Sequence, residues 1–346
     1  MQVLPQLGRV TVLCLATLLM LVRGRSEESA GNERMEAFFR ARGYEPVRLE
    51  LTRQNKLMAA GVLEDRKIRC LVDTGWSQSS VTAPYVGHAT ELTNIVAGGF
   101  DAFGAVFAPQ QEHLVALETL KLGRCQFMGQ PVSVIAATHR HSMADDAPTG
   151  SLIPRSTKGS AEYNLVLGWD FLVRNFALID CNRATLYFRG AEAPASLQTT
   201  IRESLRQSGF SEIPLQETHY NHGIVAGRMK DREVLFQVDT GAFASQLDQE
   251  EAKRLGLVGH SLHARAIGAA GGSSELDLAH TDDIQLAGHR VGKYRIGISD
   301  LSALNKLRQL YKLPPIVGII GMDLLSRDEA VVDCQGGRIF MRSHAE

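Results

Sequence analysis

One tripeptide occurs twice at the end of an apolar run, in Cys70-Leu71-Val72-Asp73-Thr74-Gly75 and in Phe236-Gln237-Val238-Asp239-Thr240-Gly241-Ala242. The apolar residues before each tripeptide predict strands over Ile68–Val72 and Val234–Val238. A single Asp-Thr-Gly is a common way to end a strand, because an Asp side chain readily bonds to the backbone two residues on. Two copies at equivalent places in one chain are far more informative, and they indicate a duplicated functional loop.

The two tripeptides belong to an internal repeat. Met35–Gly75 aligns without gaps on Ile201–Gly241, and Leu165–Leu172 aligns on Gly318–Leu325 at a shorter offset. Two ordered matches within one chain predict a duplicated fold. The sequence therefore divides into two homologous lobes, over residues 33–190 and 199–346, joined near Gly190–Ala195.

Each lobe is expected to open with a short helix and to continue in strands. The first helix would end at Gly43 and the second at Gly209. Strands are expected over Leu57–Leu63 and Ile224–Met229, with hairpin turns at Asp65-Arg66 and Asp231-Arg232. Further helices are expected over Glu250–Leu255, capped by Asp248, and over Leu301–Leu310, capped by Asp300. The chain as a whole is expected to be mainly β, with a few short helices.

Composition excludes several classes of protein. The 346 residues are 44% hydrophobic and 22% charged, which is ordinary for a globular chain and rules out disorder or a coiled coil throughout. The net charge of −1 gives no support to a nucleic-acid partner, which would need a clustered basic face. Abundant glycine (32 residues) suits many tight turns between short strands.

The N-terminal segment is expected to be a targeting signal. The apolar run Val10–Val22 is shorter than the roughly 20 residues that span a bilayer, so residues 1–24 resemble a signal peptide cleaved after Gly24. Because Arg23 and Arg25 follow the run, an uncleaved anchor attached to the membrane through residues 10–22 is the alternative. We therefore expect an exported protein, periplasmic or secreted.

Four cysteines remain after such cleavage: Cys70, Cys125, Cys181 and Cys334. An even number fits an oxidising compartment, although the pairing does not follow from the sequence. No closely spaced cysteine pair of the zinc-binding kind is present. Three close histidine pairs lack acidic or cysteine partners at ligand spacing, so surface positions are expected for them: His139/His141, His219/His222 and His260/His263. No metal is expected.

With these motifs the chain resembles the aspartic peptidases. Each lobe resembles a retropepsin subunit, and the fused pair resembles the bilobal, pepsin-like arrangement; the resemblance covers nearly everything after about residue 33. It implies a bilobal acid-protease fold of two retropepsin-like β-barrel lobes. It also implies an endopeptidase that acts on polypeptides without a cofactor. Because both aspartates lie on one chain, a monomer should suffice.

The resemblance also assigns roles to residues. Asp73 and Asp239 would meet across the lobe interface, share one proton and activate a water molecule. Thr74 and Thr240 would bond into the opposite lobe, and Gly75 and Gly241 would allow the backbone close to the carboxylates. The strands that end at Gly168 and Gly321 would pack beneath these loops.

Three features depart from the family pattern or leave it open. Ala242 fits retropepsins, whereas Trp76 fits neither branch of the family, and its indole could line, support or block the cleft. A catalytically inactive bilobal peptide-binding protein is therefore the rival interpretation. Glycine-rich hairpins at Gly98 and Gly99 and at Gly271 and Gly272 are candidate flaps, or ordinary turns.

Other acidic residues receive structural assignments. Asp170 and Asp323 are expected to cap the N-termini of short helices, and Asp180 and Asp333 to sit at strand ends. The polar segment from His139 to Tyr163 is expected to be an exposed loop. No Gly-x-Ser-x-Gly motif or dinucleotide fingerprint is present, so serine-hydrolase and cofactor chemistry have no motif behind them.

Overall fold

The computed structural model describes residues 33–87, 89–95, 112–135, 163–216, 223–268 and 272–342. Contacts divide the chain into two units, residues 1–44 and 45–346. In the first unit, a helix covers residues 33–40 and is followed by Gly43 with φ of 79°, as the C-terminal glycine predicts. The expected signal segment lies outside the described residues. In the described part of the chain, no helix is long and apolar enough to cross a membrane.

Within the second unit, the strands of the first half close on themselves. Antiparallel pairs join β1 to β2, β2 to β3, β5 to β6, β6 to β7 and β6 back to β2, while β8 lies parallel to β3 and β4 parallel to β7. A short antiparallel contact between β4 and β8 completes the ring. The strands are β1 (Tyr44–Leu51), β2 (Leu57–Leu63), β3 (Arg66–Val72), β4 (Ser80–Thr82), β5 (Thr90–Ile95), β6 (Glu112–Leu122), β7 (Cys125–Ile135) and β8 (Leu165–Leu167).

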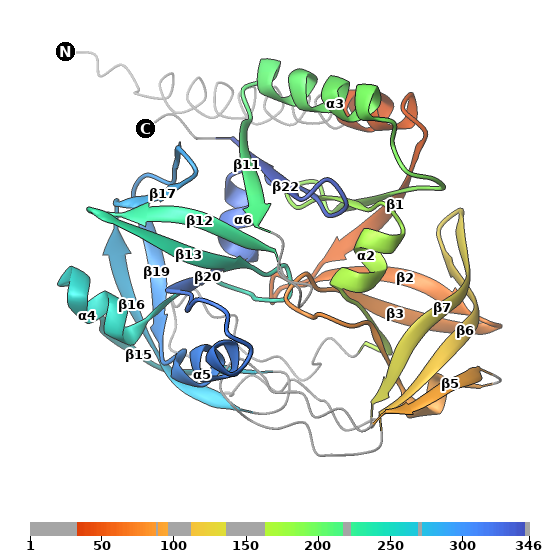
Figure 1. Cartoon of the computed structure of the whole chain (residues 1–346), viewed down its shortest axis with the longest axis horizontal. Helices are drawn as coiled ribbons and strands as arrows, with labels where there is room; N and C mark the ends of the chain where they lie inside the picture. Colours follow the sequence, from red (N-terminus) through yellow and green to blue (C-terminus); the bar gives the residue numbers. More distant parts are fainter. Residues whose placement is uncertain are drawn as a thin grey trace, which may run out of the picture. The chain divides into compact units, whose positions relative to one another are not determined.

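The second half repeats this order, and Figure 1 shows the two sets of strands as separate halves. β12 pairs with β13, β13 lies parallel to β20, β14 lies parallel to β19, and β19 pairs with β16. The strands are β12 (Ile224–Met229), β13 (Arg232–Val238), β14 (Gln246–Asp248), β15 (His260–Ile267), β16 (Ser273–Thr281), β17 (Ile284–Leu286), β18 (His289–Arg290), β19 (Tyr294–Ser299) and β20 (Gly318–Ile320). The prediction of a mainly-β fold of two barrel-like halves is confirmed.

One pair of glycines explains part of the repeat. Gly61 in β2 lies opposite Leu122, and Gly227 in β12 lies opposite Leu286. A Cβ atom would come within 2.9 Å of the Lys121 carbonyl oxygen at Gly61 and within 2.8 Å of the Gln285 carbonyl oxygen at Gly227. Both barrels therefore close through a backbone contact that leaves no room for a side chain.

A third set of strands joins the two halves. β9 pairs with both β10 and β21, β21 pairs with β22, and β22 pairs with β11, all antiparallel. These strands are β9 (Leu178–Asp180), β10 (Thr185–Arg189), β11 (Ser211–Gln216), β21 (Val331–Asp333) and β22 (Arg338–Met341). Asp180 and Asp333 end their strands, as predicted. The lobe boundary near Gly190–Ala195 stays a prediction.

Helices are short and lie between the strands. They are η1 (Ala83–Tyr85), α2 (Trp169–Arg174), α3 (Ala195–Gln207), α4 (Gln249–Leu255), α5 (Ser302–Leu310) and α6 (Met322–Arg327). The helix predicted after Asp248 is confirmed: the Asp248 carboxylate accepts the Glu250 N–H, and Gly256 ends the helix with φ of 70°. The cap predicted at Asp300 is wrong by one residue: Leu301 holds the N-cap position of α5, although the Asp300 carboxylate accepts the Ser302 N–H at 2.8 Å.

Two local predictions are wrong by a small margin. The hairpin turns lie at Glu64-Asp65 and Lys230-Asp231, one residue earlier than expected, because Glu64 and Lys230 take the left-handed conformation with φ near 50°. Asp170 and Asp323 do not cap their helices: the cap positions belong to Gly168 and Gly321, which have no side chain to donate or accept.

None of the four described cysteines forms a disulfide, and only Cys125 is not fully buried. The even cysteine count therefore receives no support as a disulfide framework.

Candidate active site

The two Asp-Thr-Gly loops begin where β3 and β13 end. Each loop is held by the strand parallel to it: the Asp73 N–H donates to the Leu167 carbonyl oxygen at 3.1 Å, and the Asp239 N–H donates to the Ile320 carbonyl oxygen at 2.9 Å. Next along the chain, the Trp169 N–H donates to the Trp76 carbonyl oxygen at 2.8 Å, and the Met322 N–H donates to the Ala242 carbonyl oxygen at 2.9 Å. The Leu167-Gly168 and Ile320-Gly321 segments therefore support the loops from below, as the resemblance implies.

The two loops are bonded to each other through their threonines. The Thr74 N–H donates to Thr240 Oγ1 at 3.0 Å, and the Thr240 N–H donates to Thr74 Oγ1 at 3.0 Å. Each hydroxyl then donates across the interface, Thr74 to the Val238 carbonyl oxygen at 3.0 Å and Thr240 to the Val72 carbonyl oxygen at 2.9 Å. Both threonines are fully buried, so four hydrogen bonds without competition from water fix the loops.

The glycines bring each loop against the opposite aspartate. A Cβ atom added to Gly75 would overlap the Asp239 carboxyl group, and one added to Gly241 would overlap the Asp73 carboxyl group. Only glycine fits either position. The two carboxyl groups therefore lie on either side of the loop interface, each against the glycine of the opposite loop.

The surroundings of Asp73 favour retention of a proton. Although the residue keeps some exposed surface, burial of its carboxyl group and the nearby Asp239 charge raise the pKa of Asp73 well above its usual value. The Lys56 ammonium group and the Gly75 N–H, which donates to Asp73 Oδ1 at 2.9 Å, act in the opposite direction. A pair with one proton between two carboxyl groups is the arrangement that can act as an acid and a base at once.

Asp239 receives more backbone donors than Asp73. Its Oδ1 accepts the Gly241 N–H at 2.7 Å and the Ala242 N–H at 3.0 Å. The bond to a backbone carbonyl is common to both loops: the Trp76 N–H donates to the Asp73 carbonyl oxygen at 3.3 Å, and the Ala242 N–H donates to the Asp239 carbonyl oxygen at 3.2 Å in addition to its bond to Oδ1. Donors to an ionised carboxylate stabilise the charged form.

The mispredicted helix caps support the loops instead. Asp170 Oδ1 accepts both the N–H and the hydroxyl of Ser79 at 2.7 Å, and Asp323 Oδ1 accepts those of Ser245 at 2.8 and 2.9 Å. The Tyr294 hydroxyl also donates to Asp323. Both serines lie four residues after the glycine of an Asp-Thr-Gly loop, so these carboxylates fix the chain that leaves each loop.

The sequence analysis missed the turn that contacts the second loop. Lys56 Nζ donates to the Gly241 carbonyl oxygen, and Asn55 Nδ2 donates to the Phe243 carbonyl oxygen at 2.9 Å. One signal was available: Asn55 and Asn221 are identical in the repeat although neither lies in a predicted strand.

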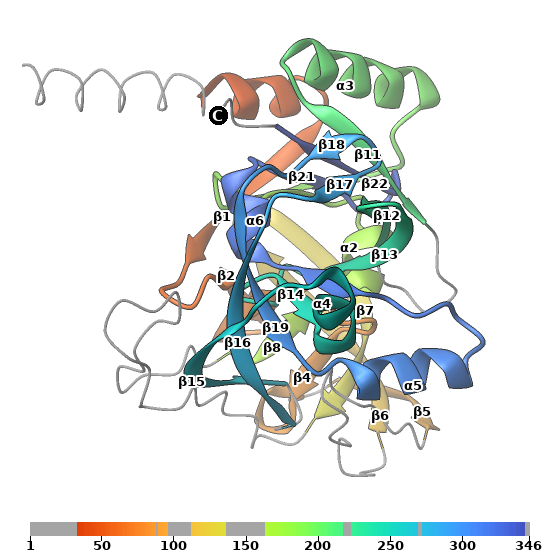
Figure 2. The ribbon, with the colours of Figure 1, turned by 90° about the vertical axis from the view of Figure 1, so that its left-hand side faces the viewer.

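The candidate flap of the second half is a described hairpin except at its tip. β15 and β16 run side by side (Figure 2), and the Gly268 N–H donates to the Gly272 carbonyl oxygen at 2.7 Å. Ala266 and Leu276 of this hairpin pack against Phe243, which follows the second loop. Gly271, and both Gly98 and Gly99 of the other candidate flap, lie outside the described residues.

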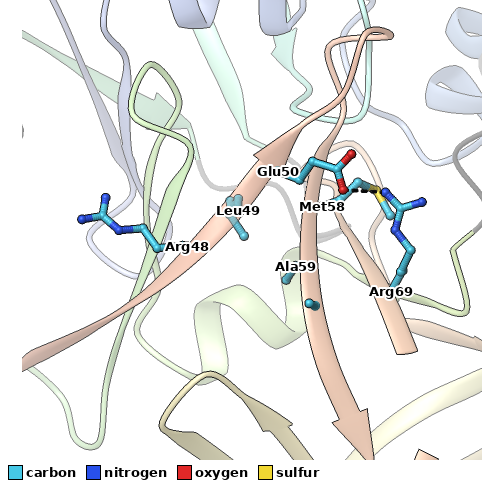
Figure 3. Close-up of a pocket in the computed structure, with 7 residues that line it drawn as sticks. Arg48, Leu49, Glu50, Met58, Ala59 and Arg69 are labelled. Atoms are coloured by element: carbon cyan, nitrogen blue, oxygen red, sulfur yellow. Dashed lines mark hydrogen bonds and ion pairs between the residues drawn. The ribbon is translucent and has the colours of Figure 1, made fainter. Parts of the chain in front are cut away.

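No group of three or more metal-ligating side chains occurs within the described ranges. A hollow of about 280 Å³ lies on β1–β3 (Figure 3), lined by Arg48, Leu49, Glu50, Met58, Ala59, Ala60 and Arg69. It contains none of the Asp-Thr-Gly residues, and its exposed Glu50–Arg69 ion pair at 2.8 Å contributes little stability.

Comparisons with known proteins gave one family match and several structural neighbours. A family model described as aspartyl protease matches residues 225–324. The aspartic proteinase of Irpex lacteus aligns with a TM-score of 0.46 and 13% identity, over 87% of this chain and 98% of that chain. Conglutin gamma, a basic 7S globulin from lupine seeds, aligns with a TM-score of 0.47 and 11% identity, over 87% of this chain and 95% of that chain. No curated protein matches the sequence.

The family match covers β13, the Asp239 loop and β20, which are the parts that build one side of the site. The first half repeats the same parallel strand pair and the same tripeptide. The resemblance drawn from the two motifs is confirmed for the second half, where residues 225–324 match the aspartyl protease family model.

Proposed function

We propose that this protein is an aspartic endopeptidase that hydrolyses peptide bonds with a water molecule activated by Asp73 and Asp239. The observation that carries the proposal is the placement of the two carboxyl groups. Each lies against the glycine of the opposite loop, and the Asp239 charge, together with burial, raises the pKa of Asp73. Both halves keep the aspartate, the threonine and the glycine of the motif, which peptide binding without turnover would not require.

The residues suggest a division of labour in the reaction. The ionised carboxyl group of the pair takes a proton from the water as the water oxygen attacks the amide carbon. The protonated partner donates its proton to the carbonyl oxygen, which gives a tetrahedral intermediate. Transfer of a proton to the amide nitrogen then lets the C–N bond break. The threonine hydrogen bonds hold the two carboxyl groups in place throughout.

The decisive experiment replaces each aspartate by its isosteric amide. Purified mature protein is incubated with an unfolded protein across acidic to neutral pH, with and without pepstatin, and the products are identified by mass spectrometry. Asp73→Asn and Asp239→Asn should each abolish cleavage while circular dichroism stays unchanged, and the two losses should not add in the double variant. Asp231→Asn, on an exposed hairpin turn, is the matched control and should cleave normally.

Two outcomes would contradict the proposal. One is near wild-type turnover by either amide variant. The other is tight binding of unfolded polypeptide by the wild-type protein with no cleavage at any pH, which would favour a peptide-binding protein instead.

We further propose that the protein acts as a monomer and is exported. Both aspartates belong to one chain, so specific activity should stay constant on dilution. A steep fall on dilution would point to a dimeric site. N-terminal sequencing of the native protein should begin at Arg25 if the signal is cleaved after Gly24. An intact N-terminus in the membrane fraction would favour the uncleaved anchor.

A further inference from the structure

The turn between β1 and β2 is a small, well-bonded structure. The Thr52 N–H donates to the Lys56 carbonyl oxygen at 2.9 Å, and the Lys56 N–H donates to Thr52 Oγ1 at 3.1 Å. The Asn55 N–H donates to the Thr52 carbonyl oxygen at 3.0 Å, and Asn55 has φ of 53°, which Asn tolerates better than most residues. These hydrogen bonds fix the backbone of the turn from which the side chains of Asn55 and Lys56 project.

Both side chains are directed at the loop of the other half. Asn55 Nδ2 donates to the Phe243 carbonyl oxygen at 2.9 Å, and Lys56 Nζ donates to the Gly241 carbonyl oxygen. Gly241 is the residue whose Cα packs against the Asp73 carboxyl group. The Lys56 ammonium group is thus bonded to the residue that packs against the Asp73 carboxyl group.

The charge of Lys56 is not neutralised by a salt bridge. Among the described residues, no carboxylate lies within ion-pair distance of its ammonium group, and the side chain is half-buried. A half-buried cation keeps much of its influence on neighbouring charges, because less water surrounds it. The carboxyl group that responds to it is Asp73, whose ionised form it favours.

We propose that Lys56 is a positioning residue of the catalytic pair: it ties the turn after β1 to the Gly241 carbonyl and supplies the positive charge that keeps the pair from binding a second proton. This inference rests on the proposed function, because it concerns the same two aspartates. It assigns to the first half a charged group that has no part in the Asp-Thr-Gly motif.

The direction of the effect follows from the groups around Asp73. In the described ranges, the titratable groups that act on Asp73 are Asp239 and Lys56, and the Asp73 charge in turn raises the pKa of Tyr163. Asp239 raises the pKa of Asp73, and Lys56 lowers it. Removing the Lys56 charge therefore makes both protonation steps of the pair occur at higher pH. The singly protonated state that works exists between these two steps, so both limbs of the pH–rate profile should move upward.

The experiment compares variants that separate charge from hydrogen bonding. Lys56→Gln keeps a donor and removes the charge, Lys56→Arg keeps the charge, and Asn55→Ala removes the neighbouring contact without changing charge. The measurement is kcat/KM against pH on one peptide. We expect Lys56→Gln to shift the acidic limb upward by about one pH unit, so that activity on that limb falls about tenfold. Lys56→Arg and Asn55→Ala should leave the limbs in place.

Lys67→Gln is the matched control, since it removes an exposed lysine from β3 in the same half. It should leave the profile unchanged. Unshifted limbs in Lys56→Gln, or an equal shift in Lys67→Gln or Asn55→Ala, would overturn the assignment.

A second measurement does not require turnover. In protein labelled with ¹³C at the aspartate side-chain carboxyl carbon, the resonances of Asp73 and Asp239 are assigned with the two amide variants and followed against pH. Lys56→Gln should raise the apparent pKa of the pair. If the wild-type protein proves inactive but this shift is present, the proposed function fails and the role of Lys56 stands. If the protein is active and the resonances titrate identically, the role of Lys56 fails alone.

Discussion

The two Asp-Thr-Gly loops make matching hydrogen bonds and have different surroundings. Their threonine hydrogen bonds match within about 0.1 Å, and each glycine meets the opposite carboxyl group. Beyond that core, the first loop has Lys56 beside its aspartate, while the second loop has two backbone donors on Asp239 and a tyrosine behind Ser245. The two loops therefore share the geometry of the pair and differ in its electrostatics.

The difference makes the two aspartates unequal. Asp239 accepts two backbone N–H groups, which stabilise its charge, whereas Asp73 accepts one and has a raised pKa. This favours Asp73 as the member that holds the shared proton and Asp239 as the base. Lys56 limits how strongly Asp73 holds that proton.

Substitutions of Gly75 and Gly241 test whether the two loops approach the opposite carboxyl group equally closely. Gly75→Ala and Gly241→Ala each introduce a methyl group into the opposite carboxyl group, so we expect each to lower kcat/KM at least about a hundredfold. Gly190→Ala, where no atom lies within 4 Å of the added Cβ, should have little effect. Steady-state kinetics on one peptide measures this. A tenfold difference in kcat/KM between Gly75→Ala and Gly241→Ala would show that the two loops are not equivalent.

The threonines test the same equality through stability. Thr74→Val and Thr240→Val each remove two hydrogen bonds and leave a buried N–H unsatisfied, which should lower the free energy of unfolding by about 3 kcal/mol. Thr74→Ser and Thr240→Ser keep the hydroxyl and should retain most of the stability. Urea unfolding gives the values. A loss of stability in only one of the two valine variants would show that the two threonines contribute unequally to the free energy of unfolding.

Tyr294 tests a feature that, among the described residues, occurs in the second half. Burial and the Asp323 charge raise the pKa of Tyr294, so its phenol stays protonated and donates to Asp323. Tyr294→Phe should lower the free energy of unfolding by about 2 kcal/mol, since the lost hydrogen bond involves a charged acceptor. Tyr85→Phe, in η1 of the first half, is the control for loss of a phenol and should cost much less. Equal losses in urea unfolding would contradict a special role for Tyr294.

How far the sequence could predict this structure depends on the range of the interactions. The strands Leu57–Leu63 and Ile224–Met229 were predicted to the residue, because apolar runs bounded by turns are local signals. The contact of Lys56 with Gly241 joins residues 185 positions apart, and only the packing of the two halves creates it. Asp170 and Asp323 were misassigned for the same reason: a first-turn acid suits a local cap, but the serine after each loop provides two donors at once.

Substitution of Ala242, the residue after the second Asp-Thr-Gly, should give the smallest effect on the pH dependence of the pair. The aspartic peptidases of the pepsin branch often have Ser or Thr after Asp-Thr-Gly, and such a hydroxyl can donate to the ionised carboxylate. Here Trp76 and Ala242 lack it, although the Ala242 N–H already donates to Asp239 Oδ1 at 3.0 Å. Because these hydroxyl donors are missing and burial raises the pKa of Asp73, the pair should work in weakly acidic to near-neutral solution.

Ala242→Ser should therefore move the acidic limb of kcat/KM downward, by about 0.5 pH unit, because a new donor to an ionised carboxylate favours the charged form of the pair. The shift should be smaller than that from Lys56→Gln, since the backbone N–H groups already satisfy much of the carboxylate. Ala244→Ser adds a hydroxyl two residues further on and serves as the control. An upward shift in Ala242→Ser, or a strongly acidic optimum in the unmodified protein, would mean that contacts other than these loop donors set the protonation of the pair.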